Sequence, residues 1–278
     1  MALKLHAVCV LMLCLACTAD AAELKQKTAE AFERYIRATE ARMLQESSPR
    51  QPFLWIDRMP EQTREVFYTK LREGQVYVEH LETDQNGESI EIPDGLVHHW
   101  VGIVFIPGAT LQRTMAVLQD YDNHQITYGP YIRRSKLLRR DGNNFDVFLQ
   151  FYRKAIVAVV LDAEFQVHYA QQVDPARIQS RSYSTRIAEV ENPGQPNEKE
   201  KPAGKDHGYL WRLYTYSHLE EKDGGVYFQL ESIALTRRVP VGLGWLINPF
   251  LKRIPRESLS MLLSATRKAV IAKADAAH

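Results

Sequence analysis

Cysteine is almost absent from this sequence of 278 residues, and so is any excess of charge. Its three cysteines are Cys9, Cys14 and Cys17, so no disulfide can form within the chain beyond residue 17. The formal net charge is +1 at pH 7, which gives no electrostatic case for binding nucleic acid. Beyond the first residues, no apolar run reaches the length of a membrane span, because charges such as Arg253 and Arg267 interrupt the best candidate.

Recognisable catalytic motifs are also missing. The sequence contains no G-x-S-x-G, no H-E-x-x-H and no phosphate-binding loop. His98 and His99 are adjacent in a predicted strand, so they point to opposite faces and cannot bind one metal ion. We therefore expect no metal and no cofactor. Acid–base catalysis by Glu231 with Tyr214 or Tyr216 is the one enzymatic alternative that the residues leave open.

The first 21 residues have the pattern of a secretory signal peptide. Lys4 precedes the apolar stretch Ala7–Ala16, and Ala19-Asp20-Ala21 supplies the small residues of a cleavage site near Ala22. This pattern predicts a secreted or periplasmic protein. An alternative is lipid attachment at Cys17, although Cys14 stands where a lipoprotein signal usually has leucine.

Residues 22–73 are predicted to form a helical extension. The stretch 22–46 is rich in alanine and glutamate and has Ala31 and Tyr35 on one side, as in an amphipathic helix. A second helix is predicted over 60–72, with Val66, Phe67 and Leu71 buried. How the two helices dock cannot be read from the pattern.

From residue 74 the apolar period changes to two, which is typical of strands. Strands are predicted over 75–81, 96–106, 145–153, 157–169, 177–190, 209–219 and 225–238, with a helix over 110–120 after the second. The segment 191–208 is rich in proline, glycine and charge and is predicted to be a flexible loop. The last element is a long helix from Pro255, whose apolar residues recur every three or four positions. These elements predict an α+β domain over 74–278 with a curved antiparallel sheet.

The order strand, helix, several strands, helix resembles the helix-grip fold of the START and polyketide cyclase/dehydrase-like (SRPBCC) superfamily. The resemblance rests on Ile106-Pro107-Gly108-Ala109-Thr110 with the helix after it, and on the tail from Glu231 through Gly244-Trp245-Leu246 to Leu259. It covers about residues 96–273. It implies a curved sheet wrapped around the C-terminal helix, with an elongated apolar cavity between them that holds a hydrophobic ligand.

Candidate ligand-binding residues follow from this expectation. Apolar walls and a few polar groups are typical of such cavities. The expected lining residues are Phe151, Leu161, Arg181, Arg212, Phe228, Glu231, Trp245, Leu259, Leu262, Leu263 and Thr266. An inward arginine would need a carboxylate or an anionic ligand headgroup, because an unpaired buried charge costs several kcal/mol. Alternatively, these charged residues face solvent, and the apolar ones fill a solid core.

The sequence thus supports a secreted protein that binds a fatty acid, a phospholipid or a similar hydrophobic molecule, with transient membrane contact during ligand exchange. Two alternatives remain open. One is an enzyme of the cyclase, dehydrase or hydrolase type that uses the same cavity. The other is an interaction module with a filled core.

Overall fold

The computed structural model describes residues 24–46, 52–85, 87–154, 158–172, 176–238 and 244–275. Side chains are described over the same ranges, except for 45–46, 244–252 and 274–275. The predicted signal peptide and its cleavage site therefore lie outside the described residues.

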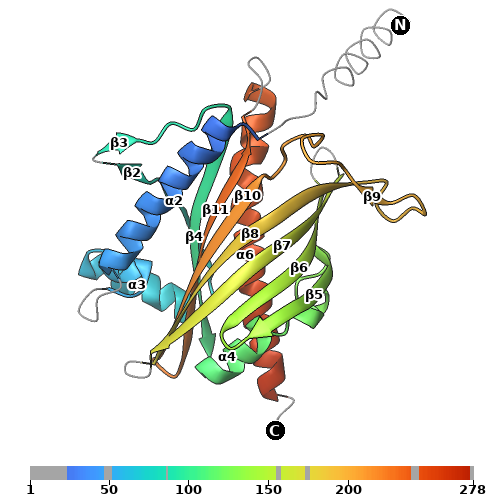
Figure 1. The fold of residues 1–278 in the computed structure, drawn as a ribbon. Helices are drawn as coiled ribbons and strands as arrows, with labels where there is room; N and C mark the ends of the chain where they lie inside the picture. Colours follow the sequence, from blue (N-terminus) through green and yellow to red (C-terminus); the bar gives the residue numbers. More distant parts are fainter. Residues whose placement is uncertain are drawn as a thin grey trace, which may run out of the picture.

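One large antiparallel sheet dominates these residues (Figure 1). Its strand order is β1-β4-β11-β10-β8-β7-β6-β5, and the short β9 pairs with the end of β8. The strands are β1 (Tyr77–His80), β4 (Gly95–Pro107), β5 (Ile132–Asp141), β6 (Asn144–Lys154), β7 (Ala158–Gln172), β8 (Arg177–Glu191), β9 (Lys199–Glu200), β10 (Arg212–Lys222) and β11 (Gly225–Arg237). A separate small hairpin is formed by β2 (Asp84–Gln85) and β3 (Glu88–Ser89).

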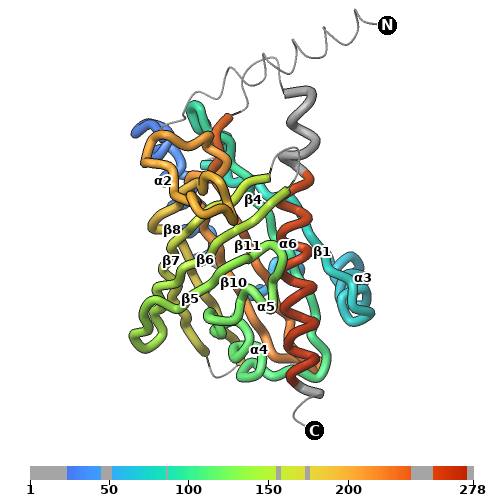
Figure 2. The backbone as a smooth tube through the Cα atoms, turned by 90° about the vertical axis from the view of Figure 1, so that its right-hand side faces the viewer, coloured from blue at the N-terminus to red at the C-terminus, as the bar shows by residue number. Residues whose placement is uncertain are grey.

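The concave face of the sheet is covered by the C-terminal helix α6 (Gly244–Asp275) and by the short helices α4 (Leu111–Leu118), η2 (Tyr121–Asn123) and α5 (His124–Thr127). Figure 2 shows α6 running along the sheet for most of its height. Gly102 of β4 permits this close approach, because a Cβ there would lie 2.6 Å from Leu263 Cδ1. The α6 helix begins at Gly244 and continues through Pro255, so our prediction of a start at Pro255 was wrong by about three turns.

The convex face of the same sheet is covered by the N-terminal extension, which consists of α2 (Gln26–Glu46), η1 (Trp55–Arg58) and α3 (Glu61–Arg72). Phe32 of α2 lies one turn from Tyr35 and Ile36, so all three share one side of the helix and pack on Ile233 and Leu235 of β11. In α3 the buried residues are Tyr68 and Leu71, whereas Val66 is 52% exposed, contrary to prediction. The sheet is thus sandwiched between helices over its β1–β8 half.

Two further elements differ from expectation. The edge strand β5 was not predicted, because its sequence IRRSKLLRRD is charged on both faces and has no alternating pattern. The segment 191–208, predicted to be flexible, contains β9, whose Lys199 and Glu200 pair with Glu191 and Val190 of β8.

The α+β helix-grip architecture itself is confirmed: a curved antiparallel sheet holds the long terminal helix on its concave face. Among the helices of the described ranges, none is long and apolar enough to span a membrane.

Candidate functional site

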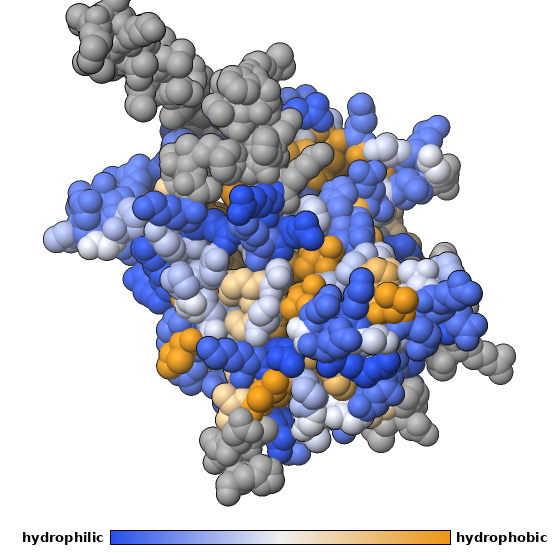
Figure 3. Space-filling model, turned by 180° about the vertical axis from the view of Figure 1, so that it is seen from behind, coloured by the Kyte–Doolittle hydropathy of each residue, from blue (hydrophilic) through white to orange (hydrophobic). Residues whose placement is uncertain are grey.

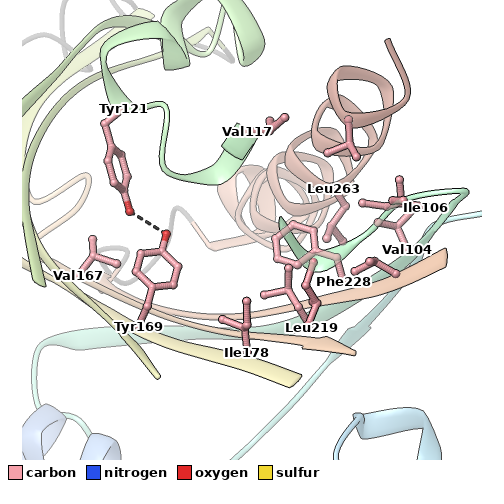
Figure 4. Packing of buried hydrophobic residues seen from close by; sticks show 14 of the residues in the cluster. Val104, Ile106, Val117, Tyr121, Val167, Tyr169, Ile178, Leu219, Phe228 and Leu263 are labelled. Carbon is pink, nitrogen blue, oxygen red and sulfur yellow. Dashed lines mark hydrogen bonds between the residues drawn. The ribbon is translucent and has the colours of Figure 1, made fainter. Parts of the chain in front are cut away.

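The region between the concave face and α6, called the chamber below, is occupied mainly by apolar side chains from both sides (Figure 4). Alternation along each strand places one residue in two on this face. Leu259, Leu263 and Val270 of α6 are buried there against Val104 of β4 and Phe228 of β11. This part of the chamber is closely filled.

A second group of apolar side chains on the same face is only half-buried. These residues lie toward the end of the sheet at which α6 begins, and they pack at the margin of the filled core. They are Trp100, Leu149, Phe151, Ile187, Leu213 and Leu230. Apolar surface left partly exposed inside a covered face is unfavourable in water, so this end of the chamber is suited to an apolar ligand.

Two adjoining openings of about 650 Å³ and 330 Å³ lie beside this end, between α6 and the chain around Tyr131. Arg153, at the end of β6, crosses from the sheet to α6. Its guanidinium lies 3.2 Å from Glu257 Oε2 and 3.4 Å from the carbonyl oxygen of Ile254, and it stacks 4.7 Å from the ring centre of Tyr131. Arg153 thereby links the sheet edge to the helix beside the opening.

The rim of these openings is cationic. Arg153, Lys154, Arg253 and Arg256 line it together with a single carboxylate, Glu257. Glu257 accepts a hydrogen bond of 2.5 Å from Arg253 Nε, and this bond together with the nearby arginine charges lowers the pKa of the carboxyl. Figure 3 shows the molecule from behind relative to Figure 1. Hydrophilic side chains cover most of this side, with smaller apolar areas among them.

The topology of the chain now identifies its fold. A first long strand, β4, is followed by α4, then by the antiparallel strands β5 to β11, and last by α6 along the concave face. The fold is START-like.

Comparisons with solved structures give similar arrangements at low sequence identity. A STAR-related lipid transfer protein (fragment 25–204) from Xanthomonas axonopodis is 18% identical with a TM-score of 0.48, over 70% of this chain and 93% of that one. Human STARD10 is 10% identical with a TM-score of 0.44, over 76% and 80%. The Zhui aromatase/cyclase from Streptomyces sp. R1128 is 11% identical with a TM-score of 0.41, over 63% and 94%. No protein-family model matches the chain, and no curated protein has a significant sequence match.

Several predicted lining residues lie in or beside the START-like chamber. Phe228, Leu259, Leu263 and Thr266 are buried in its filled part, and Phe151 is half-buried near the opening. Leu161 is buried directly opposite Phe151 on the neighbouring strand, and Leu262 is half-buried on α6. The side chain of Trp245 lies outside the described residues. Contact of these residues with a ligand remains a prediction.

Glu231 does not face the chamber, contrary to expectation. It lies on the convex face, where Arg42 of α2 donates a hydrogen bond of 2.5 Å and His99 Nε2 donates one of 2.7 Å to its Oε1. The hydroxyl of Tyr35 is hydrogen-bonded to His99 Nδ1 at 2.9 Å. Burial alone would raise the pKa of Glu231, but the bond from His99 and the charge of Arg42 hold it below its usual value. Glu231 therefore joins the N-terminal extension to the sheet.

The two predicted arginines also lie on the convex face. Arg181 donates to Glu40 of α2 at 2.7 Å. Arg212 stands directly opposite Leu235, whose side chain packs under α2. The expectation that Arg181, Arg212 and Glu231 line the cavity is therefore wrong, because their strands turn these positions away from α6. The alternation from Phe228 and Leu230 already placed Glu231 on the other face, and this signal was missed.

Among the residues that the structure describes, the side chains proposed for acid–base catalysis do not meet in the chamber. Tyr214 and Tyr216 lie on the convex face and donate to Glu33 and Glu40 of α2, at 3.3 Å and 2.7 Å. His98 does face the chamber, but burial lowers its pKa to about 4 and its Nε2 is bonded to Thr236 at 3.0 Å. Among the described residues, no group of three metal-ligating side chains converges.

Sequence reasoning missed the residues that border the opening. Arg153 was read only as the end of a strand, and Arg253 as part of an interrupted apolar stretch. A charged residue at the end of an alternating apolar set, as Arg153 is after Phe151, was the available signal.

Proposed function

We propose that the protein binds a hydrophobic ligand, such as a fatty acid or a phospholipid, between the concave face and the first half of α6. The observation that carries this proposal is the set of half-buried apolar side chains beside the openings near Tyr131. Burial of apolar ligand surface supplies about 25 cal/mol per Å², so a long acyl chain supplies most of the binding free energy.

The charges at the rim support an amphipathic ligand. Arg153, Arg253 and Arg256 form a cationic border at the openings, outside the apolar side chains of the chamber. A ligand with an anionic end at this border would keep its charge near solvent and would avoid the cost of burying it. The signal-peptide pattern of residues 1–21 supports secretion or a periplasmic location, where transient membrane contact gives access to lipids.

The direct test uses native mass spectrometry of the purified protein, lipid extraction, and uptake of the neutral fluorescent probe N-phenyl-1-naphthylamine. We expect co-purified lipid or saturable probe uptake by the wild-type protein. Recovery of lipid-free protein that also takes up no probe would contradict the proposal.

A pair of variants locates the binding region. Leu149→Trp adds volume at a half-buried chamber position and should lower probe affinity at least fivefold. Leu138→Trp makes the same change on β5 at a side chain that is 52% exposed, and it should leave affinity unchanged. Urea unfolding of both variants separates lost binding from lost folding. Equal affinities in the two variants would contradict a ligand in the chamber.

A further inference from the structure

Two tyrosines form an isolated polar pair on the concave face of the sheet, level with the last turns of α6 and therefore at the inner end of the chamber, away from the openings. Tyr121 belongs to η2 and Tyr169 to β7, and their hydroxyl oxygens are 2.8 Å apart. The two residues are 5% and 8% exposed. Figure 4 shows the two side chains extending from their separate elements so that their hydroxyls point toward each other.

A count of donors shows that one hydrogen of this pair is unused. Each phenol carries one O–H hydrogen and can also accept hydrogen bonds. When one tyrosine donates to the other, the hydrogen of the accepting tyrosine still needs a partner. Among the residues that the structure describes, neither hydroxyl has another hydrogen bond. A buried donor without a partner is destabilising by about 1–3 kcal/mol.

A third buried tyrosine on the same side of the sheet, Tyr128, differs in this respect. Thr266 donates its hydrogen to the carbonyl oxygen of Leu262 at 2.9 Å. Tyr128 must therefore be the donor in its 3.1 Å bond with the Thr266 hydroxyl. Both hydrogens of the Tyr128–Thr266 pair are used within the protein, so this pair has none to offer.

The surroundings of the Tyr121–Tyr169 pair are apolar except for His124, whose ring lies 4.9 Å from that of Tyr121 and is uncharged at neutral pH because burial lowers its pKa to about 4. Phe145 lies 5.5 Å from each of the two rings, between centroids, and Val167 packs in the same cluster. Burial raises the pKa of both phenols above the usual value, so both remain protonated donors at neutral pH. An anion placed here would lose its hydration without gaining a cation, which costs far more than one hydrogen bond returns.

We propose that the Tyr121–Tyr169 pair donates its unused hydrogen to an uncharged oxygen acceptor, a ketone or ester carbonyl, on a ligand that extends from the openings to the inner end of the chamber. This inference deepens the proposed function and rests on it. It divides recognition between two places: the cationic rim for a charged end and the tyrosine pair for a neutral carbonyl.

The test compares two fluorescent probes of similar size. The ketone 6-propionyl-2-(dimethylamino)naphthalene carries a carbonyl acceptor, and N-phenyl-1-naphthylamine carries none. The double variant Tyr121→Phe/Tyr169→Phe removes both hydroxyls, since either one alone could still donate. Tyr128→Phe is the matched control, because it removes an equally buried hydroxyl whose hydrogen is already used.

We expect the double variant to bind the ketone about three- to tenfold more weakly than wild type does, the range for one neutral hydrogen bond. Its affinity for the amine probe should stay within twofold, and the emission of the bound ketone should shift to the blue. Tyr128→Phe should leave the ratio of the two affinities unchanged. In urea, the double variant should be at least as stable as either single variant, because removing both partners leaves no unpaired donor.

The outcomes separate the two proposals. If the wild-type protein takes up neither probe, the proposed function fails and this inference fails with it. If wild type takes up the amine but the double variant keeps the same ratio of affinities, the tyrosine pair is no ligand donor and the binding function stands. Equal weakening of both probes would likewise overturn the inference, because a hydrogen bond to the carbonyl cannot produce it.

Discussion

Acid should destabilise this protein through two buried histidines. His98 and His124 are 8% and 7% exposed, and burial lowers the pKa of each imidazole to about 4. In the unfolded chain a histidine has a pKa of about 6.5. Between these two values the unfolded state binds protons that the folded state does not, so stability falls as the pH falls.

The size of the effect follows from the two pKa values. Going from pH 7 to pH 5 should cost about 2 kcal/mol of unfolding free energy for each histidine, or about 4 kcal/mol for both. Domains are typically stable by about 5–15 kcal/mol, so this loss is a large share of the total.

Urea unfolding at pH 7 and pH 5 measures the loss as a change in midpoint at constant slope. His98→Gln and His124→Gln should each reduce the pH-dependent loss by about 2 kcal/mol, whatever their effect at pH 7. Other groups that titrate in this range are the same in all three proteins and cancel in the comparison. A variant with the same difference between pH 7 and pH 5 as wild type would refute the reasoning.

Two further substitutions test the packing on the two faces of the sheet. Gly102→Ala places a methyl group 2.6 Å from Leu263 Cδ1, so the side chains of Leu263 and Leu259, or α6 itself, must shift. The protein should lose about 1–3 kcal/mol of unfolding free energy, measured by urea unfolding. An unchanged midpoint would show that these side chains move without cost. Arg42→Met leaves Glu231, whose side chain is 3% exposed, with His99 as its remaining partner. Its cost should be about 2–3 kcal/mol because the arginine itself is 31% exposed, and a loss below 0.5 kcal/mol would contradict the role given to this ion pair.

The arrangement of the START-like domain was largely predictable from the sequence, because period-two alternation and the apolar stripe of α6 each record burial on one side. Strand β4 and the cap residue Thr110, which accepts from the Arg113 amide at 3.3 Å, follow from such local signals. Strand β5 does not, because an edge strand can carry charge on both faces.

The candidate site was less predictable, because it depends on which face each charged residue occupies after pairing. Arg181 lies in β8, where both faces carry polar residues and alternation gives no direction. Its partner, Glu40, is 141 positions away in the sequence. No local pattern records that the N-terminal helices cover the convex face. This covering gives Arg181 its carboxylate partner and makes a buried position acceptable for Glu231.

The pairing of Arg42 with Glu231 also limits how early the N-terminal helix can pack on the sheet. The two residues are 189 positions apart, and most of the sheet lies between them. At synthesis rates of about 5–20 residues per second, the N-terminal helix waits roughly 10 to 40 seconds before its strand partner exists. During that interval the apolar side of the helix, with Phe32 and Ile36, has no sheet to cover it. The helix α2 is thus made early but packs on the sheet late.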